Sequence, residues 1–277
     1  MPTYRLHCFA QSGNAYKVAL YLNCAGIEWE PVFVDYMAGA TRDPEWRARV
    51  NPMGEVPVLE VDDKRLTQSG AILTWLADKT GKFAPKGDEQ RYEALRWILF
   101  DNHKFTSYLA TYRFQRCFMP QPPDPAVLAF LRMRIDGALS VVNEHLSKTP
   151  YLLGEEPTIA DFSIAGYLFY PSTELGYDFE TSHKNIYAWT QRMKAIPGWK
   201  DPYDLIPGEP VVIGPFNRSV DGLVAKGKPR RSKMTARLAN FRSTARDRAT
   251  YSAPSTTTMS MTPALSRNLR ASAYSGE

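Results

Sequence analysis

The first 80 residues alternate between strand-like and helical patterns of hydrophobic and polar positions. From residue 4 to residue 9 every second position is apolar, as in a strand with one buried face. Ser12 supplies a capping side chain directly before residues 15–25, whose apolar spacing predicts a helix. Residues 27–34 predict a second strand. Pro31 confines this strand to an edge of the sheet, because proline has no amide hydrogen to donate.

Two further strands and a helix follow. Residues 56–61 and 64–67 predict a hairpin that turns at two aspartates. Ser69 then begins a helix in which apolar residues recur at helical spacing: Ile72, Leu73, Trp75 and Leu76. This part of the chain therefore predicts an α/β fold.

Residues 83–88, FAPKGD, break the periodic pattern, and we place a domain boundary there. Beyond them the pattern is helical. One amphipathic stretch covers residues 89–118 and another covers residues 126–147, with a proline-rich turn between them. Further helices are expected from Thr158 and over residues 185–195.

The formal net charge of +5 conceals two parts of opposite charge. Residues 208–277 hold 12 Lys and Arg but only 4 Asp and Glu. Residues 1–207 hold 22 Lys and Arg and 25 Asp and Glu, so this part is slightly acidic. The same 70 residues contain 16 Ser and Thr but only 11 Ile, Leu, Val and Phe, too few for a packed core. We therefore expect an α/β domain over residues 1–82, an all-helical domain over 88–207 and a disordered basic tail over 208–277.

The sequence lacks the short motifs of several large protein classes. The four histidines have no HExxH or HxxxH spacing, and the three cysteines form no CxxC pair. No Walker loop, GxSxG or GxGxxG occurs. We expect no metal site, no permanently bound cofactor and no disulfide framework. No apolar run reaches the roughly 18 residues of a membrane span, and the first residues lead into a strand, so a reducing cytoplasm is the expected compartment.

Three polar junctions remain as candidates for chemistry: Ser12-Gly13-Asn14, Val56-Pro57 and Gln68-Ser69. Taken alone, Ser12 and Ser69 are typical of ordinary helix N-caps. Pro57 is equally consistent with a trans proline at the start of a strand.

Several segments, in this order, resemble the bacterial cytosolic glutathione transferases. Residues 9–18, FAQSGNAYKV, are similar to the SGNxYKV segment of that family. NPMGEVPVL at 51–59 and QSGAIL at 68–73 are similar to its next segments, and TIAD at 158–161 and IPGW at 196–199 match its helical half. The resemblance covers about residues 3–207, and its specificity lies in the order of the segments.

The resemblance implies a thioredoxin-like N-terminal domain followed by an all-helical domain, the glutathione transferase architecture. It implies glutathione as co-substrate, attack of its thiol on an apolar electrophile between the domains, and a role in detoxification. Peroxide or disulfide reduction would be a secondary activity. It also implies a homodimer in which the first domain of one subunit meets the helical domain of the other.

The resemblance makes Ser12 or Asn14 the residue that stabilises the glutathione thiolate. A cysteinyl thiol has a pKa of about 8.5, so only a few per cent is thiolate near neutrality. A donor aimed at the sulfur beside a helix N-terminus favours the anion. Ser12 is the first choice and Asn14 the second, because some bacterial members use the asparagine. Neither Cys8 nor Cys24 occupies the Ser12 position, which disfavours thiol transfer by a cysteine of the protein.

The resemblance assigns glutathione binding to the other two junctions. A cis Val56-Pro57 peptide would turn the Val56 backbone toward the cysteinyl group, and Ser69 would hold the γ-glutamyl carboxylate. Gln68 stands where glutamate is usual, which weakens the contact to the glutamyl amine. Glu55 stands where glutamine or lysine is common, and it places a negative charge near the glycyl carboxylate unless its side chain points away.

Aromatic residues recur at helical spacing in the first long helix of the second half. By default they form core. In the family the same helix walls the co-substrate pocket, which makes Phe105, Tyr108 and Tyr112 candidate lining residues. Asp161 in the TIAD segment belongs to a capping box, and we interpret it as structural.

Three hypotheses of function follow. The first is a glutathione transferase. The second is a non-catalytic glutathione-binding or protein-interaction member of the same fold, which Gln68 and Glu55 favour. The third is binding of nucleic acid or a membrane surface by the basic tail, which would be weak and non-specific. The sequence leaves the electrophile unnamed, because apolar pockets accept many shapes.

Overall fold

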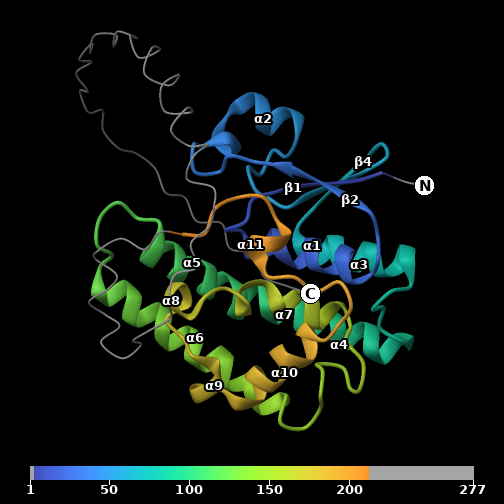
Figure 1. Ribbon diagram of the computed structural model, residues 1–277, viewed down its shortest axis with the longest axis vertical. Helices are drawn as coiled ribbons and strands as arrows, with labels where there is room; N and C mark the ends of the chain where they lie inside the picture. Colours follow the sequence, from blue (N-terminus) through green and yellow to red (C-terminus); the bar gives the residue numbers. More distant parts are fainter. Residues whose placement is uncertain (1–2, 212–277) are drawn as a thin grey trace, which may run out of the picture. The chain divides into compact units, whose positions relative to one another are not determined.

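Four strands in the N-terminal part of the chain form one mixed sheet in the order β2-β1-β3-β4. Figure 1 shows this sheet in blue, with three of its strands labelled. The computed structural model of the protein describes residues 3–211. β1 (Tyr4–Cys8) pairs in parallel with β2 (Trp29–Phe33) and antiparallel with β3 (Val58–Val61). β3 continues through a hairpin into β4 (Lys64–Thr67). The predicted strands and hairpin are confirmed.

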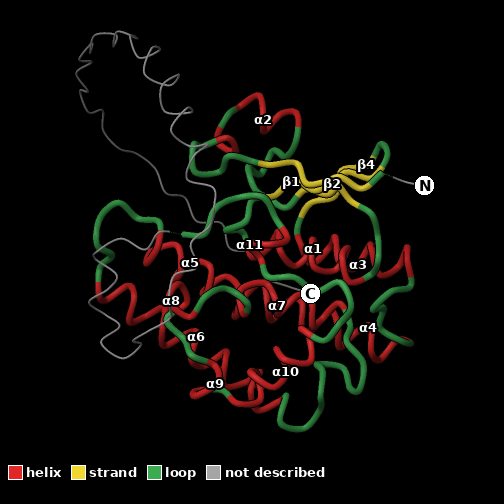
Figure 2. Tube along the Cα trace, in the orientation of Figure 1, coloured by secondary structure: helices red, strands yellow, loops and turns green. Residues whose placement is uncertain are grey.

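Helices cover both faces of this sheet. Figure 2 shows α1 (Gly13–Cys24) and α3 (Ser69–Thr80) on one face and the short α2 (Pro44–Arg49) on the other. A single 3-10 turn, η1 (Ala40–Arg42), precedes α2. The sequence pattern did not predict α2, because six residues are too few to show a helical period.

β2 lies at the edge of the sheet, as the proline in its middle requires. Pro31 pairs with Leu6 of β1, and on its other side Leu6 pairs with Leu59 of β3. Leu6 and Leu59 are fully buried, so the core beneath the sheet is centred on β1 and β3.

The remaining elements of the described part of the chain, up to residue 211, are all helical. In chain order they are α4 (Gly87–Phe100), η2 (Asp101–Phe105), α5 (Thr106–Cys117), α6 (Pro125–His145), α7 (Ile159–Leu168), α8 (Ser172–Leu175), α9 (Phe179–Ser182), α10 (Lys184–Lys194) and α11 (Pro202–Leu205). All ten residues of α7 are buried, and α7 packs against α1 of the sheet domain. The chain is therefore a thioredoxin-like domain followed by an all-helical domain, as expected.

The stretch predicted as one regular helix over 89–118 contains a π-helical turn, η2. Asp101, its first residue, is fully buried and accepts hydrogen bonds from Lys17, Ser163 and Thr106. A π turn holds one extra residue, so it rotates the following helix relative to a regular continuation. Which side chains of α5 face the sheet domain depends on this turn.

Asp161 is structural, as predicted. Its carboxylate accepts hydrogen bonds from the amide and hydroxyl of Thr158, the amide of Leu152 and the indole of Trp189. It therefore fixes the start of α7 against two neighbouring segments. Among residues 3–211 no helix is long and apolar enough to cross a membrane, and no cluster of side chains suits a metal ion. The predicted disordered tail lies, from residue 212, outside the described residues.

Candidate functional site

A cavity of about 450 Å³ lies where the sheet domain meets η2 and α5. All six residues predicted to activate or bind glutathione line it: Ser12, Asn14, Val56, Pro57, Gln68 and Ser69. They come from three separate segments, namely the start of α1, the loop before β3 and the start of α3. The fold thus brings together residues that are up to 57 positions apart in the sequence.

Ser12 is the N-cap of α1 and is almost completely buried at the cavity wall. Its hydroxyl oxygen accepts a hydrogen bond from the Ala15 amide at 3.2 Å. A hydroxyl can accept one hydrogen bond and donate another at the same time. The capping role and a donor role toward a ligand in the cavity are therefore compatible.

The N-terminal ends of two long helices meet at this cavity. Asn14 lies in the first turn of α1, and Ser69 is the first residue of α3. The Ser69 hydroxyl donates a hydrogen bond to Oδ1 of Asn14 at 3.4 Å. The amides of a first helical turn carry partial positive charge and favour an anion. Two such ends at one cavity favour a ligand with more than one negative or electron-rich group.

The loop before β3 is shaped by a buried side chain. Asn51 is 2% exposed; its amide donates to the carbonyl of Glu55 at 2.9 Å, and its Oδ1 accepts from the amide of Met53. The Val56-Pro57 peptide that follows is cis, as predicted. Val56 and Pro57 both line the cavity.

The two departures from the family pattern contact each other. The Gln68 side-chain amide donates a hydrogen bond to the Glu55 carboxylate at 3.0 Å. Gln68 has a φ of 65°, in the left-handed region that residues other than glycine rarely adopt. Glu55 thus points toward the start of α3, and among the described residues lining the cavity it is the acidic one.

The three residues that the resemblance implies for the co-substrate pocket, Phe105, Tyr108 and Tyr112, are not among the residues that line this cavity. Phe105 and Tyr112 are 1% and 4% exposed within the core, and Tyr108 lies beneath Arg134 of α6. The aromatic spacing marks the face of α5 that packs on the helical domain. The opposite face, reoriented by η2, lines the cavity with smaller or hydroxyl side chains: Thr106, Ser107, Ala110 and Thr111.

The apolar side of the cavity comes from residues that the sequence did not mark as pocket-lining. Phe9, at the end of β1, stacks on Tyr36 with ring centroids 4.8 Å apart. Phe114 and Phe118 of the α5 end stack with centroids 5.7 Å apart, and Met37 lies in the loop after β2. Tyr36 and Met37 lie in a loop, where hydrophobic residues follow no helical or strand period. Only the aromatic or apolar character of their side chains could have indicated that they line a pocket.

Arg113 of α5 is the cationic residue at the wall of the cavity within the described part of the chain. It is 1% exposed, and its guanidinium pairs with Glu174 at 2.5 Å. A cavity with two helix N-termini, one carboxylate and an apolar wall can bind a zwitterionic peptide beside an apolar molecule.

Comparisons with known proteins agree with this geometry. A family model described as "Glutathione S-transferase, N-terminal domain" matches residues 3–78, and "Glutathione S-transferase, C-terminal domain" matches residues 108–197. Glutathione S-transferase F14 of Arabidopsis thaliana is 29% identical over 206 residues, which cover 70% of this chain and 80% of the relative.

Solved structures give the same result. A glutathione S-transferase from Pseudomonas fluorescens is 33% identical with a TM-score of 0.65, covering 73% of this chain and 99% of that one. A possible glutathione transferase from Rhodopseudomonas palustris is 32% identical with a TM-score of 0.67, covering 74% and 99%. The transferase URE2P6 of Phanerochaete chrysosporium, solved with oxidized glutathione, is 26% identical with a TM-score of 0.63, covering 70% and 92%.

Proposed function

The chain belongs to the glutathione S-transferase family, and on that premise we propose that it binds glutathione in the cavity and activates the thiol for attack on an apolar electrophile. The observation that carries the proposal is the convergence of two helix N-termini and the loop before β3 on one cavity with an apolar wall. The bacterial Ser/Asn subclass is part of the proposal, because residues 12–18 read SGNAYKV.

Glutathione would lie along the polar side of the cavity. Its γ-glutamyl carboxylate would accept hydrogen bonds from the Ser69 hydroxyl and the first amides of α3. Its cysteinyl backbone would pair with the main chain of Val56 beside Pro57, like an added strand. Its amino group would contact the carboxylate of Glu55, which the hydrogen bond from Gln68 orients.

Activation of the thiol would come from Ser12, with Asn14 as second donor. Each unit by which the pKa of the bound thiol is lowered stabilises the thiolate by about 1.4 kcal/mol. The positive end of α1 adds to this effect. The thiolate sulfur would then form a bond to an electrophilic carbon and displace its leaving group. With a peroxide or a disulfide it would instead attack the O–O or S–S bond and release an alcohol or a thiol, after which a second glutathione would complete the reduction by forming glutathione disulfide.

The electrophile would lie against the apolar wall. This wall is formed by Phe9, Tyr36, Met37, Phe114 and Phe118. The exposed edges of Met37 and Phe114 leave room for molecules of different size. We therefore propose a broad class of flat or elongated apolar electrophiles rather than one compact substrate.

A homodimer is part of the same proposal. Tyr92, Leu95 and Leu99 of α4 are each more than half exposed and recur at helical spacing. An exposed apolar stripe of this kind is typical of a surface that a partner covers. A second copy of the chain is the partner that the family membership favours.

A second candidate function is a non-catalytic member that binds glutathione or a protein. The hydrogen bond between Gln68 and Glu55 favours it, because it occupies both side chains when no ligand is present. Catalytic turnover of glutathione with an electrophile distinguishes the two candidate functions, because only the transferase shows it.

The test measures conjugation of 1-chloro-2,4-dinitrobenzene and, separately, glutathione affinity by calorimetry, between pH 5.5 and 8. We expect Ser12→Ala or Asn14→Ala to lower kcat more than affinity and to shift the rate profile to higher pH. Thr74→Ala, which removes a hydroxyl of α3 that bonds to its own helix, is the matched control and should change neither.

Each outcome has a definite meaning. If both active-site variants keep the wild-type rate across this range, the assignment of the thiolate donor is wrong. Binding without turnover by the wild type supports the non-catalytic candidate. Absence of both binding and turnover contradicts the proposed function.

A further inference from the structure

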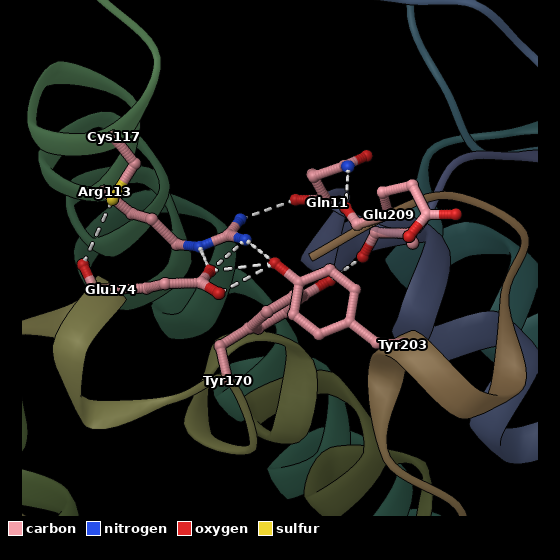
Figure 3. Close-up of polar contacts among 8 residues, drawn as sticks. Gln11, Arg113, Cys117, Tyr170, Glu174, Tyr203 and Glu209 are labelled. Carbon is pink, nitrogen blue, oxygen red and sulfur yellow. Dashed lines mark hydrogen bonds and ion pairs between the residues drawn. The ribbon is translucent and has the colours of Figure 1, made fainter. Parts of the chain in front are cut away.

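Arg113 lies almost fully buried on α5, and its guanidinium donates hydrogen bonds in three directions (Figure 3). Nε and Nη2 donate to one carboxylate oxygen of Glu174 at 2.8 and 2.5 Å. Nη2 also donates to the hydroxyl of Tyr203 at 2.8 Å. Nη1 donates to the backbone carbonyl of Gln11 at 2.6 Å.

The third of these acceptors lies next to the proposed thiolate donor. Gln11 directly precedes Ser12 in the loop between β1 and α1. The carbonyl of the residue before it, Ala10, accepts a hydrogen bond from the Tyr170 hydroxyl at 2.6 Å. Two consecutive carbonyls of this loop are thus held by side chains of the helical domain.

The segment after α11 holds the other side of the same loop. The Ala10 amide donates to the carbonyl of Pro207 at 2.9 Å, and the Gln11 side chain donates to the carbonyl of Glu209. Figure 3 shows the Gln11 and Glu209 contact beside the guanidinium of Arg113. The loop backbone before Ser12 is therefore fixed from the helical domain and from residues 207–209.

The network around the guanidinium is closed and electrically balanced. Arg113 and Glu174 are 1% and 2% exposed, so their charges offset each other inside the protein. The Tyr203 hydroxyl accepts from Arg113 and donates to Glu174 at 2.9 Å. Burial raises the pKa of Tyr203, so this hydroxyl keeps its proton. The network therefore acts on its surroundings through geometry more than through net charge.

We propose that Arg113 is a positioning residue for the thiol chemistry, which fixes the Gln11 carbonyl and thereby places the Ser12 hydroxyl at the cavity. The role rests on the proposed function of Ser12. Only a guanidinium has a planar set of donors that reaches a carboxylate, a hydroxyl and a carbonyl at once. A lysine would keep the charge and lose this arrangement.

A structural salt bridge and a positioning residue make different predictions. Loss of a structural bridge lowers stability and leaves the reaction of the folded fraction unchanged. Loss of a positioning residue lowers kcat of the folded protein, because a small displacement of a reacting group costs up to about a hundredfold in rate. The pH profile of the reaction also moves, because the thiol loses its aligned donor.

The experiment compares the full chain with Arg113→Lys, Tyr203→Phe and the matched control Arg132→Lys. Arg132 of α6 also donates to a backbone carbonyl, that of Gly176 at 2.8 Å, far along the chain from the loop. The measurements are kcat and KM for glutathione with 1-chloro-2,4-dinitrobenzene, the pH profile, and amide hydrogen exchange in residues 9–12.

We expect Arg113→Lys to lower kcat about tenfold, to change the KM for glutathione less than twofold, and to move the pH profile upward. Exchange of the Ser12 amide, which donates to the Phe9 carbonyl, should become faster. Tyr203→Phe keeps both charges and should give a smaller change of the same kind. Arg132→Lys should leave all of these values unchanged.

Unchanged kcat and pH profile in a folded Arg113→Lys protein would overturn the positioning role. An equal loss of kcat and glutathione affinity would also overturn it, in favour of direct binding. If Arg113→Lys does not fold, Tyr203→Phe decides by the same criteria. If the wild type shows no turnover, the proposed function fails. In that case amide hydrogen exchange still tests whether Arg113 fixes the loop: unchanged exchange rates of residues 9–12 in Arg113→Lys would contradict it.

Discussion

The buried ion pair between Lys17 and Asp101 offers the sharpest test of how the two domains are held together. Lys17 Nζ of α1 lies 2.5 Å from Asp101 Oδ2 at the start of η2, and both side chains are fully buried. Asp101 also accepts hydrogen bonds at 2.6 Å from Thr106 and Ser163. The informative change is Asp101→Asn, which has nearly the same shape and removes the negative charge.

The expected loss of stability follows from the burial of the partner that remains. Removing one member of a buried ion pair leaves an uncompensated charge and costs about 3–5 kcal/mol. For a domain of this size each kcal/mol lowers the thermal midpoint by roughly 2–4 °C, so the midpoint should fall by roughly 6–20 °C. The double variant Lys17→Met with Asp101→Asn leaves no buried charge and should recover most of this loss.

The pH dependence of Asp101→Asn has a definite sign. Burial lowers the pKa of Lys17, and Asp101 opposes that effect in the wild type. Without Asp101 the folded protein binds a proton at Lys17 less readily than the unfolded chain does. The variant should therefore regain stability relative to the wild type as pH rises from 7 toward 9.

Urea unfolding at pH 7 and pH 9, followed by circular dichroism, measures these differences. A cost below about 1 kcal/mol for Asp101→Asn would show that the pair contributes little to domain packing. The single variant Lys17→Met completes the comparison. If the losses of unfolding free energy of Lys17→Met and Asp101→Asn simply add in the double variant, Lys17 and Asp101 do not interact in the folded protein.

Two further predictions concern other parts of the chain. Burial lowers the pKa of His7 more than Glu60 raises it, so the folded protein resists protonation there and stability should fall as pH drops below about 6.5, by at most about 1.4 kcal/mol per pH unit. His7→Gln should remove this component, and urea unfolding of both proteins at pH 7, 6 and 5 checks it; parallel curves would contradict it. Glu55→Gln should weaken glutathione binding about tenfold or more in calorimetry, as expected for loss of a hydrogen bond to a charged group. The double variant Glu55→Gln with Gln68→Glu should restore most of the affinity, because it exchanges the carboxylate and the amide between two side chains that are 3.0 Å apart. Equal affinity of Glu55→Gln and the wild type would refute the contact between Glu55 and the amino group of glutathione.

Features encoded by a few neighbouring residues were predictable from the sequence. The Ser12 cap, the edge position of the strand with Pro31 and the capping box of Asp161 each depend on residues at most a few positions apart. The resemblance added the cis geometry of Pro57, which composition alone does not indicate. The polar half of the cavity was predictable for this reason, because each of its segments has a local signature.

The apolar half was not predictable, because its geometry depends on contacts between distant residues. The π turn begins at Asp101, whose partner Lys17 is 84 positions away. The resemblance implied that Tyr108 and Tyr112 line the pocket, whereas the periodic pattern alone predicted core, and the structure places both side chains against the helical domain. The orientation of Glu55 toward Gln68 likewise follows from two segments that only the folded sheet brings together.

The contacts between the β1–α1 loop and residues 207–209 set an order of events during synthesis. The strands and helices up to residue 80 can pair as soon as they leave the ribosome, but the loop at Gln11 meets Glu209 only 198 residues later. At about 5–20 residues per second this interval lasts roughly 10–40 s. The sheet of the growing chain can therefore form while the β1–α1 loop still lacks its contacts to residues 207–209, and the proposed glutathione site would be completed only after the helical half has been made.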